Sequence, residues 1–180
     1  MTERELIEGC VKQRSDCQKI IYDRFSGKMM SLCLRYTNQQ QTAEDVFQEG
    51  FVRAFDCMHQ FKFEGSFEGW LRRVFASVAA RHLRKKKIQF DELNEAKHFH
   101  QHAVEPAIVS KLSEEEIHRL IRMLPDGYRM VFNLNVIEGY SHDEIAGILG
   151  IQPATSRVQL LKARRYLQDL IAKKQNVYSA

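Results

Sequence analysis

Basic side chains are concentrated in one stretch of the sequence, residues 66–87 (SFEGWLRRVFASVAARHLRKKK). From Arg72 onward this stretch carries seven Arg and Lys residues and no Asp or Glu. Cations without nearby carboxylates repel one another, so they need a polyanion or solvent around them. The negative end of a helix dipole would explain the cations at 84–87, but not Arg72 and Arg73 near the start. The pattern therefore favours nucleic acid binding over a solvated helix face.

A second basic stretch lies near the C-terminus, at residues 141–165. It has the pattern of a short helix, a turn at Gly150 and a longer basic helix that starts at Pro153, which is a helix-turn-helix. The second helix of this motif lies in the major groove of DNA, and its early side chains reach base edges. If Leu160, Ala163 and Leu167 face inward, we expect the helix to contact DNA through Thr155, Arg157, Gln159, Lys162, Arg164 and Arg165. The alternative is an ordinary αα-hairpin with solvated charges.

Within this second helix, the donor and acceptor groups differ in what they can recognise. Arg157 and Gln159 carry the groups that pair with guanine and adenine edges. Lys162, Arg164 and Arg165 lie later, so we expect them to hold phosphates, which carry little sequence information. Val158 is apolar and could contact a thymine methyl group or simply pack.

Hydrophobic periodicity indicates helices throughout, with no run of alternating β-branched residues. The sequence predicts an all-α protein of two small helical domains, residues 1–87 and 113–180, each of four helices, joined by an acidic linker at 88–112. Helix starts are marked by capping boxes at Thr2–Glu5, Ser113–Glu116 and Ser141–Glu144 and by capping residues at Thr42 and Ser66.

The length, charge and composition of the chain restrict the class of protein. The chain has 180 residues, a net charge of +4 and an isoelectric point near 8.9. No segment approaches 18 consecutive apolar residues, and the acidic N-terminus is unlike a signal peptide, so we expect a cytoplasmic protein without membrane insertion. The four cysteines form no CxxC pair. We interpret them as small apolar core residues, with zinc or disulfides as the alternative.

The expected third helix, about residues 42–59, carries an acidic patch. Its outward side holds Glu44, Asp45, Gln48 and Glu49, while Ala43, Val46, Phe47, Phe51, Val52 and Phe55 are expected to face inward. The first two acids also suit the positive end of the helix dipole, but that does not explain why the patch continues to Glu49. An aromatic loop with Phe61, Phe63 and Phe67 then leads into the basic helix.

The linker contains a run of alternating histidines, His98, His100 and His102. Such a run can bind a metal, but no carboxylate or cysteine partner lies at an obvious spacing, so we expect a solvated linker and no metal or cofactor. A metal-dependent enzyme that uses these histidines with the acids of residues 91–95 is the corresponding alternative.

Three segments closely resemble the extracytoplasmic-function sigma factors of bacterial RNA polymerase. They are AEDVFQEGFVRAF (residues 43–55), FEGSFEGWLRRVFASVAARHLRKKK (63–87) and LPDGYRMVFNLNVIEGYSHDEIAGILGI (124–151). They occur in the order and at the spacing of that family, and the resemblance covers almost the whole chain. It implies a promoter-specificity subunit of RNA polymerase that is not an enzyme.

The resemblance also implies roles for individual residues. The acidic patch Glu44, Asp45, Gln48 and Glu49 would bind the clamp helices of core RNA polymerase. The loop and basic helix would recognise and melt the −10 promoter element through Phe61, Phe63, Ser66, Trp70, Arg73, Ser77, Arg81, Arg84 and Lys85. The C-terminal domain would grip the polymerase flap and read the −35 element as double-stranded promoter DNA, and the linker would thread toward the RNA exit channel. An anti-sigma factor is an open further partner.

Four positions depart from the family pattern. Ala154 stands where the family usually has Gly at the start of the last helix, and Val158 where a small polar residue is common. Ser77 and Arg81 stand where the family often has Asn and Asp, so the preferred −10 sequence is expected to differ. The alternative function is a helix-turn-helix regulator that acts without stable polymerase association, although such a regulator needs neither the acidic patch nor the aromatic loop.

Overall fold

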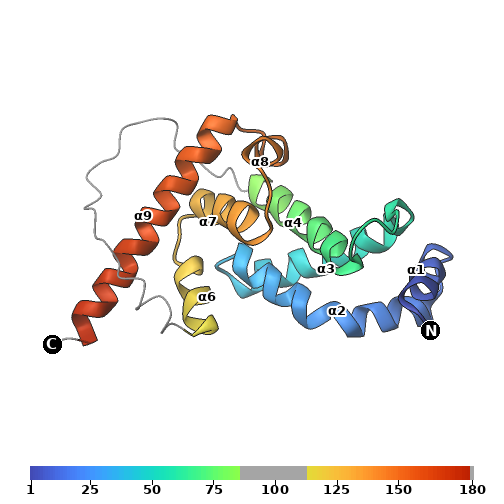
Figure 1. Cartoon of the computed structure of the whole chain (residues 1–180). Helices are drawn as coiled ribbons and strands as arrows, with labels where there is room; N and C mark the ends of the chain where they lie inside the picture. Colours follow the sequence, from blue (N-terminus) through green and yellow to red (C-terminus); the bar gives the residue numbers. More distant parts are fainter. Residues whose placement is uncertain (86–112, 179–180) are drawn as a thin grey trace. The chain divides into compact units, whose positions relative to one another are not determined.

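The computed structural model describes residues 1–85 and 113–178, and the regular structure in these two ranges is entirely helical, which confirms the all-α prediction (Figure 1). The chain divides into two compact units, Met1–His82 and Leu83–Ala180. Predictions that concern the linker, with the histidines 98, 100 and 102, and those for Lys86 and Lys87 lie outside the described residues. So does the side chain of Lys85, the last residue of its helix.

The first unit is built from four α-helices and one short 3-10 helix. These are α1 (Glu3–Val11), α2 (Ser15–Tyr36), α3 (Gln40–Asp56), η1 (Met58–Gln60) and α4 (Phe67–Lys85). Helix α2 packs against both α1 and α3. Aromatic rings fill the space between α3 and α4, where Phe75 packs edge-on against Phe51 with 5.1 Å between ring centroids.

The beginnings of these helices follow their local chemistry. The capping box predicted at Thr2 and Glu5 is confirmed, because each residue's side chain accepts a hydrogen bond from the other's backbone N–H. Ser66 caps α4 by accepting a hydrogen bond from the N–H of Gly69 at 3.1 Å. The capping role predicted for Thr42 is wrong. Helix α3 begins two residues earlier, and Thr42 is buried.

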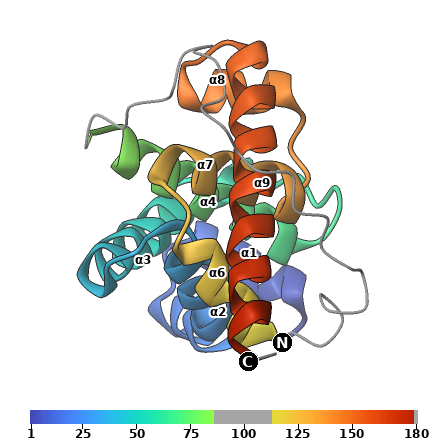
Figure 2. The same cartoon turned by 90° about the vertical axis from the view of Figure 1, so that its left-hand side faces the viewer.

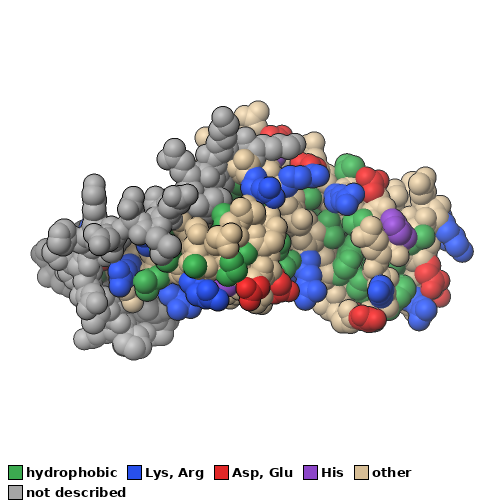
Figure 3. All heavy atoms as spheres, turned by 90° about the horizontal axis from the view of Figure 1, so that it is seen from above, with side chains coloured by type: hydrophobic (Ala, Val, Ile, Leu, Met, Phe, Trp, Pro, Cys, Tyr) green, Lys and Arg blue, Asp and Glu red, His purple; other side chains and the backbone are tan. Residues whose placement is uncertain are grey.

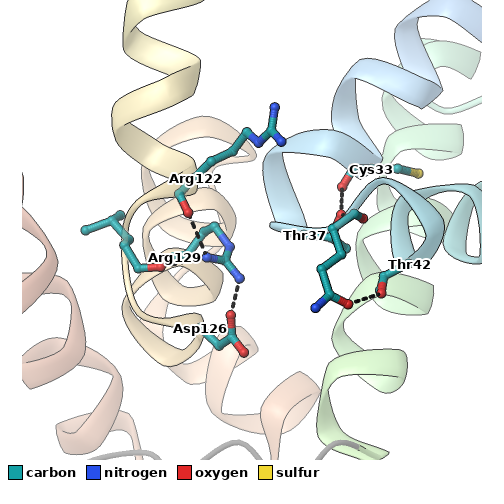
Figure 4. A network of polar contacts seen from close by, with 8 residues as sticks. Cys33, Thr37, Thr42, Arg122, Asp126 and Arg129 are labelled. Carbon is teal, nitrogen blue, oxygen red and sulfur yellow. Dashed lines mark hydrogen bonds and ion pairs between the residues drawn. The ribbon is translucent and has the colours of Figure 1, made fainter.

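The turn between α2 and α3 explains that difference. The hydroxyl of Thr37 donates to the carbonyl of Cys33 at 3.1 Å, and the hydroxyl of Thr42 donates to the side chain of Gln39 at 3.4 Å (Figure 4). Both threonines therefore satisfy their polar groups inside the turn, where a buried hydroxyl needs a partner. Thr42 follows the helix start and does not mark it.

Helices α3 and α4 approach closely at Gly50. A Cβ atom placed on Gly50 would lie 2.4 Å from the ring of Phe75, which is shorter than any normal contact. The missing side chain of Gly50 is therefore what allows the ring to pack against the backbone of α3. This contact fixes the face that α4 turns toward the core, with Leu71, Phe75 and Val78 buried.

All four cysteines are free and buried, as expected for apolar core residues. Burial raises the pKa of Cys10 to about 11 and the pKa of Cys33 to about 12. The pKa of Cys57 is also raised, mainly by burial. These thiols are therefore protonated at neutral pH, and a protonated thiol is a poor nucleophile and metal ligand.

The second unit contains the helix-turn-helix. Its helices are α6 (Glu114–Arg122), α7 (Asp126–Phe132), the π-helical turn η2 (Asn133–Ile137), α8 (His142–Leu149) and α9 (Pro153–Tyr178). Helices α6, α7 and α8 all contact α9, which runs along the unit as its longest element (Figures 1 and 2). The predicted capping boxes at Ser113 and Ser141 are both formed.

The turn of the helix-turn-helix forms as its sequence predicts. Gly150 closes α8 with a φ of 68°, in the left-handed region that glycine adopts most easily. Its N–H donates to the carbonyl of Ala146 at 2.8 Å. Pro153 is the first residue of α9, where its missing N–H would have had no partner within the helix.

A buried arginine holds the connection between α6 and α7. The side chain of Arg129 is only 1% exposed, and its guanidinium donates to the carbonyl oxygens of Leu124 at 2.6 Å and Arg122 at 3.1 Å. It also forms an ion pair with Asp126 (Figure 4). Burial lowers the pKa of Arg129, which nevertheless stays charged because an arginine begins so far above neutral pH. The arginine thus satisfies the carbonyl oxygens left open at the end of α6.

Candidate nucleic-acid interface

The exposed side of α4 carries a row of polar and basic side chains. Arg73, Ser77, Arg81 and Arg84 are all exposed and follow one another at intervals of four, four and three residues, which places them on one face of the helix. Arg72 lies off this row and is half-buried. All four residues of the row were predicted to contact the −10 element, and the structure places them together.

The start of this row opens into a pocket of about 380 Å³ within the first unit. Its lining comes from the C-terminal end of α3, from η1 and from α4: Arg53, Cys57, Gln60, Trp70, Arg73, Val74, Ser77, Val78 and Arg81. Sites for small ligands span about 300–1,000 Å³, so one nucleobase with its sugar fits the available volume. Three guanidinium groups and an indole ring surround this space, a combination suited to stacking a base and holding its phosphate.

Two polar residues of this pocket, Arg53 and Gln60, were absent from the predicted site, as were the lining residues Cys57, Val74 and Val78. Arg53 and Gln60 are both exposed. Arg53 follows a strongly apolar run in α3, and Gln60 lies in the short helix η1, so neither belongs to a basic cluster that would identify it. They reach the site because α3 and η1 pack beside α4, which is a tertiary relationship.

The aromatic loop before α4 divides into buried and exposed members. Phe61 was predicted to contact DNA but is 7% exposed, and its ring packs against Phe67 and Trp70 at centroid distances of 5.5 and 5.6 Å. The ring therefore anchors the loop in the core and does not lie on the surface, and the contact of Phe61 with the −10 element stays a prediction. Phe63 is 41% exposed and adopts a φ of 61°, unusual for a side chain of this size. The guanidinium of Arg4 lies 4.7 Å from its ring centre.

The acidic patch on α3 is present, with one addition. Glu44, Asp45 and Gln48 are exposed, as predicted. Val52 was expected to face inward, but its side chain is 62% exposed, because it lies four residues after Gln48 on the same face. The patch therefore combines carboxylates with an exposed apolar side chain, which is typical of a protein interface.

Glu49, the fourth member of this patch, lies at its edge and is half-buried. Its carboxylate forms an ion pair with Arg81 of α4, and Nδ1 of His82 lies 4.0 Å from its other oxygen. The two residues were predicted to bind different partners, polymerase and DNA. In the structure they bind each other across α3 and α4.

The face of α9 that is exposed differs from the predicted one. Ala154, Arg157, Leu161, Arg164 and Gln168 are exposed, at intervals of three, four, three and four residues. Thr155 and Arg165 are half-buried at the edges of this face. The prediction that Gln159 and Lys162 face outward is wrong, since their side chains are 0% and 8% exposed.

Helical geometry explains this correction. Gln159 lies three residues after Ser156 and four before Ala163, and both of these are fully buried, so Gln159 lies on the same side of α9. Lys162 lies three residues after Gln159, so its side chain lies on the same buried side of α9. Long polar side chains can cover apolar surface with their methylene groups, so a hydrophobicity pattern alone does not reveal them as buried.

One hydrogen bond connects the two helices of the helix-turn-helix at their N-terminal ends. Nδ1 of His142 lies 2.9 Å from the hydroxyl of Ser156, which is completely buried. Burial and the nearby cations Arg157 and Arg164 lower the pKa of His142, while Asp143 raises it to a smaller extent than burial lowers it. His142 is therefore neutral at pH 7, and it holds the first turn of α9 against the start of α8.

The surface carries charges of both signs. In the view of Figure 3, Lys and Arg side chains lie among acidic and apolar ones, so the basic rows belong to particular helix faces. Within the parts of the chain that the structure describes, no group of three or more His, Cys, Asp or Glu side chains is arranged to hold a metal ion. None of the helices in those parts combines the length and apolar character needed to cross a membrane.

An all-α chain with a basic helix in one unit and a helix-turn-helix in the other is a two-part DNA-binding protein. Comparison with known families shows which class of DNA-binding protein it is. Residues 21–88 match the family description "Sigma-70 region 2", and residues 114–167 match "Sigma-70, region 4". The chain belongs to the sigma-70 family of RNA polymerase sigma factors, within the extracytoplasmic-function group. It is an initiation factor that directs promoter-specific transcription.

Relatives of similar length support this assignment. The chain is 25% identical over 180 residues to the RNA polymerase sigma-H factor of Pseudomonas aeruginosa, covering 94% of this chain and 93% of the relative. It is also 25% identical over 182 residues to the ECF RNA polymerase sigma-E factor of Escherichia coli K12, covering 95% of each.

Solved structures share the fold. The structure of CnrH in complex with the cytosolic domain of CnrY matches with a TM-score of 0.51 at 19% identity, covering 95% of this chain and 97% of that one. The sigma factor RpoE from Bartonella quintana, in complex with the anti-sigma factor NepR, matches with a TM-score of 0.53 at 20% identity, covering 86% and 96%.

Proposed function

We propose that three separate faces of this sigma factor carry its work. The acidic patch of α3 binds core RNA polymerase, the pocket and exposed row of α4 bind the melted −10 strand, and the exposed face of α9 reads the −35 element. The division into an N-terminal domain at 1–87, a linker at 88–112 and a C-terminal domain at 113–180 serves these roles. The protein acts in the cytoplasm, and we assign it no catalytic step.

The observation that carries this proposal is the pocket in the first unit. Four of its lining residues, Trp70, Arg73, Ser77 and Arg81, were predicted to contact the −10 element from the sequence alone, and they converge on one space with Arg53 and Gln60. A stacked base contributes about 1–3 kcal/mol in complexes with single-stranded DNA. A pocket with a half-buried indole at its edge and guanidinium groups around it supplies both the stacking surface and the phosphate contacts.

The test of the pocket uses full-length protein assembled with core polymerase. Arg73→Ala is expected to weaken binding to a promoter fork with a single-stranded −10 segment, while binding to the fully double-stranded promoter changes less. Arg24→Ala is the matched control, because Arg24 is an exposed arginine on α2, outside the pocket. Equal losses for the two variants would argue against the pocket as the site of the melted strand.

The polymerase contact is tested on α3. Glu44→Lys is expected to weaken assembly with core polymerase, since it reverses an exposed charge of the acidic patch. Asp23→Lys provides the control, because Asp23 is an exposed acid in the middle of α2. If the Glu44→Lys variant assembles normally with core polymerase, polymerase does not use this patch. The same assay distinguishes a sigma factor from a helix-turn-helix regulator, which would not assemble at all.

Substitutions of the two exposed arginines of α9 are expected to affect DNA binding in different ways. Arg157 lies in the first two turns, where a groove-inserted helix meets base edges, so Arg157→Ala should change which −35 sequences are preferred, by about 1–3 kcal/mol on the best site. Arg164 lies later, so Arg164→Ala should weaken all sites alike and reduce the salt slope by about one. Uniform losses for both would make α9 a phosphate clamp.

An anti-sigma factor is proposed as a further partner. Among the solved structures with the same fold, one holds CnrH in complex with the cytosolic domain of CnrY, and another holds the sigma factor RpoE in complex with the anti-sigma factor NepR. Co-purification of the tagged chain from its own host, followed by a competition assay with core polymerase, tests this proposal. A partner that binds without displacing polymerase would not act as an anti-sigma factor.

A further inference from the structure

A large apolar side chain is exposed in the middle of the basic face of α9. Leu161 is 49% exposed and lies between Arg157, four residues before it, and Arg164, three residues after it. Single exposed apolar residues are common on protein surfaces and need no explanation in general. This one lies on the face that is proposed to enter the DNA major groove, where its environment is restricted to base edges and phosphates.

Only one base presents an apolar group in the major groove. Guanine, cytosine and adenine show hydrogen-bonding groups there, whereas thymine adds its C5-methyl group. Leu161 has no donor or acceptor in its side chain, so it gains nothing from the other three edges and loses water contact against a polar one. Its chemistry therefore selects a thymine.

The helix geometry gives the position of that thymine. Residues four apart in an α-helix are separated by about 6 Å along its axis, and successive bases of a strand are about 3.4 Å apart. Leu161 and Arg157 are four apart on one face, so their contacts fall one to two base pairs from each other. A guanine is the base that an arginine pairs with best.

We propose that Leu161 is a specificity-determining residue, which packs on the methyl group of a thymine one to two base pairs from the guanine read by Arg157. This inference rests on the proposed role of α9 in reading the −35 element. It places the apolar contact at Leu161, whereas the sequence had offered Val158 as a residue that could contact a thymine methyl group or simply pack, and Val158 is half-buried.

The experiment removes only the methyl group. A preferred upstream duplex is first selected from a randomised library with the full-length protein and core polymerase. Each thymine in it is then replaced by uracil, which lacks the methyl group. For wild-type protein, uracil at one position is expected to weaken binding about fourfold, which corresponds to the burial of one methyl-sized group at about 0.8 kcal/mol.

The variant Leu161→Ala completes the cycle. It is expected to bind the thymine duplex about as weakly as wild type binds the uracil duplex, and to show no further loss with uracil, because the two changes remove the same contact. Val136→Ala is the matched control, since Val136 is a similarly exposed apolar residue that lies in η2 and not on the exposed face of α9. Thermal melting confirms that each variant is folded.

The possible outcomes separate the two proposals. Wild-type indifference to uracil at every position, or an unchanged sensitivity in Leu161→Ala, would overturn the role of Leu161. If Arg157→Ala still alters sequence preference in that case, α9 reads the −35 element without an apolar contact. If neither variant alters preference, the proposed function of α9 fails as well.

Discussion

From the ion pair between Glu49 and Arg81 we predict which acidic residues of α3 contribute to the stability of the fold as well as to polymerase binding. Glu44 and Glu49 lie on neighbouring parts of the same helix, and both were expected to bind polymerase. The structure distinguishes them, because Glu49 holds Arg81 while Glu44 accepts only a hydrogen bond from Gln40, one turn earlier in the same helix. Reversing the charge of each should therefore have different effects on folding.

The size of the effect follows from exposure. The side chains of Glu49 and Arg81 are 36% and 55% exposed, so their pair belongs to the class of surface ion pairs worth about 0.2–1 kcal/mol. Glu49→Lys removes this pair and places a cation beside Arg81, which adds repulsion of similar size. We expect a loss of about 1 kcal/mol, or about 4–8 °C in the melting temperature of a unit of this length.

Thermal melting followed by circular dichroism measures this loss at low salt and again at about 1 M salt, where the Debye length falls to about 3 Å and the difference should shrink. The charge swap Glu49→Arg with Arg81→Glu should restore most of the stability, and Glu44→Lys should melt close to wild type. If Glu49→Lys melts like wild type, or if the swap fails to restore stability, the pair does not contribute to folding and the reasoning is refuted.

Three further predictions concern the cores of the two units. Gly50→Ala should destabilise the first unit by about 1–3 kcal/mol, because its new Cβ would clash with the ring of Phe75, and denaturant unfolding measures this; no loss would mean that α4 shifts freely. Arg129→Met should cost about 2–3 kcal/mol in the same assay, since two carbonyl oxygens and Asp126 lose their charged partner, and stability equal to wild type would contradict this. Because the pKa of His142 is lowered in the folded state, the unfolded state binds the proton more readily, so the contribution of His142 is fully present above its unfolded pKa and is lost as pH falls below about 6.5. Replacement by Asn should flatten this acid-side loss of melting temperature, and an unchanged pH profile would exclude His142 as its source.

Helix starts and the turn of the helix-turn-helix were predicted correctly, because a few neighbouring residues determine them. Ser141 and Glu144 satisfy each other's backbone groups, and Pro153 fits only a first turn. Such signals need no knowledge of what packs around them. Thr42 shows the limit, since a threonine before a helix and a threonine just inside one look alike until burial is known.

The orientation of side chains was predicted less well. On α9, the apolar pattern identified Leu160 and Ala163 as inward-facing, but it could not show that Gln159 and Lys162 accompany them. Polar side chains are assigned outward by default, although a long one can be buried along its stem. Apolar side chains are likewise assigned inward by default, and this assumption placed Val52 of α3 inside although it is exposed.

The contacts between distant residues could not be predicted at all. Glu49 and Arg81 are 32 residues apart, and Arg53 lines the same pocket as Arg73 only because α3 and α4 pack side by side. A residue was predicted to belong to the site only where it lay in a cluster of similar residues in the sequence. The pocket is a product of the fold, because the sequence indicated residues on α4 but not the residues that α3 and η1 add to them.

The buried cysteines have a practical consequence for experiments on this protein. Since all four native thiols are buried, and burial raises the pKa of Cys10, Cys33 and Cys57, a maleimide dye should react far more slowly with the native thiols than with a cysteine introduced on the surface. Gly27 offers such a position, because a Cβ atom there would meet no neighbouring atom within 4 Å beyond its own helix backbone, and a cysteine suits a helix interior better than glycine does. A fluorophore attached at Gly27→Cys would report the arrival of this subunit on polymerase and its departure, one molecule at a time, without removal of any native cysteine.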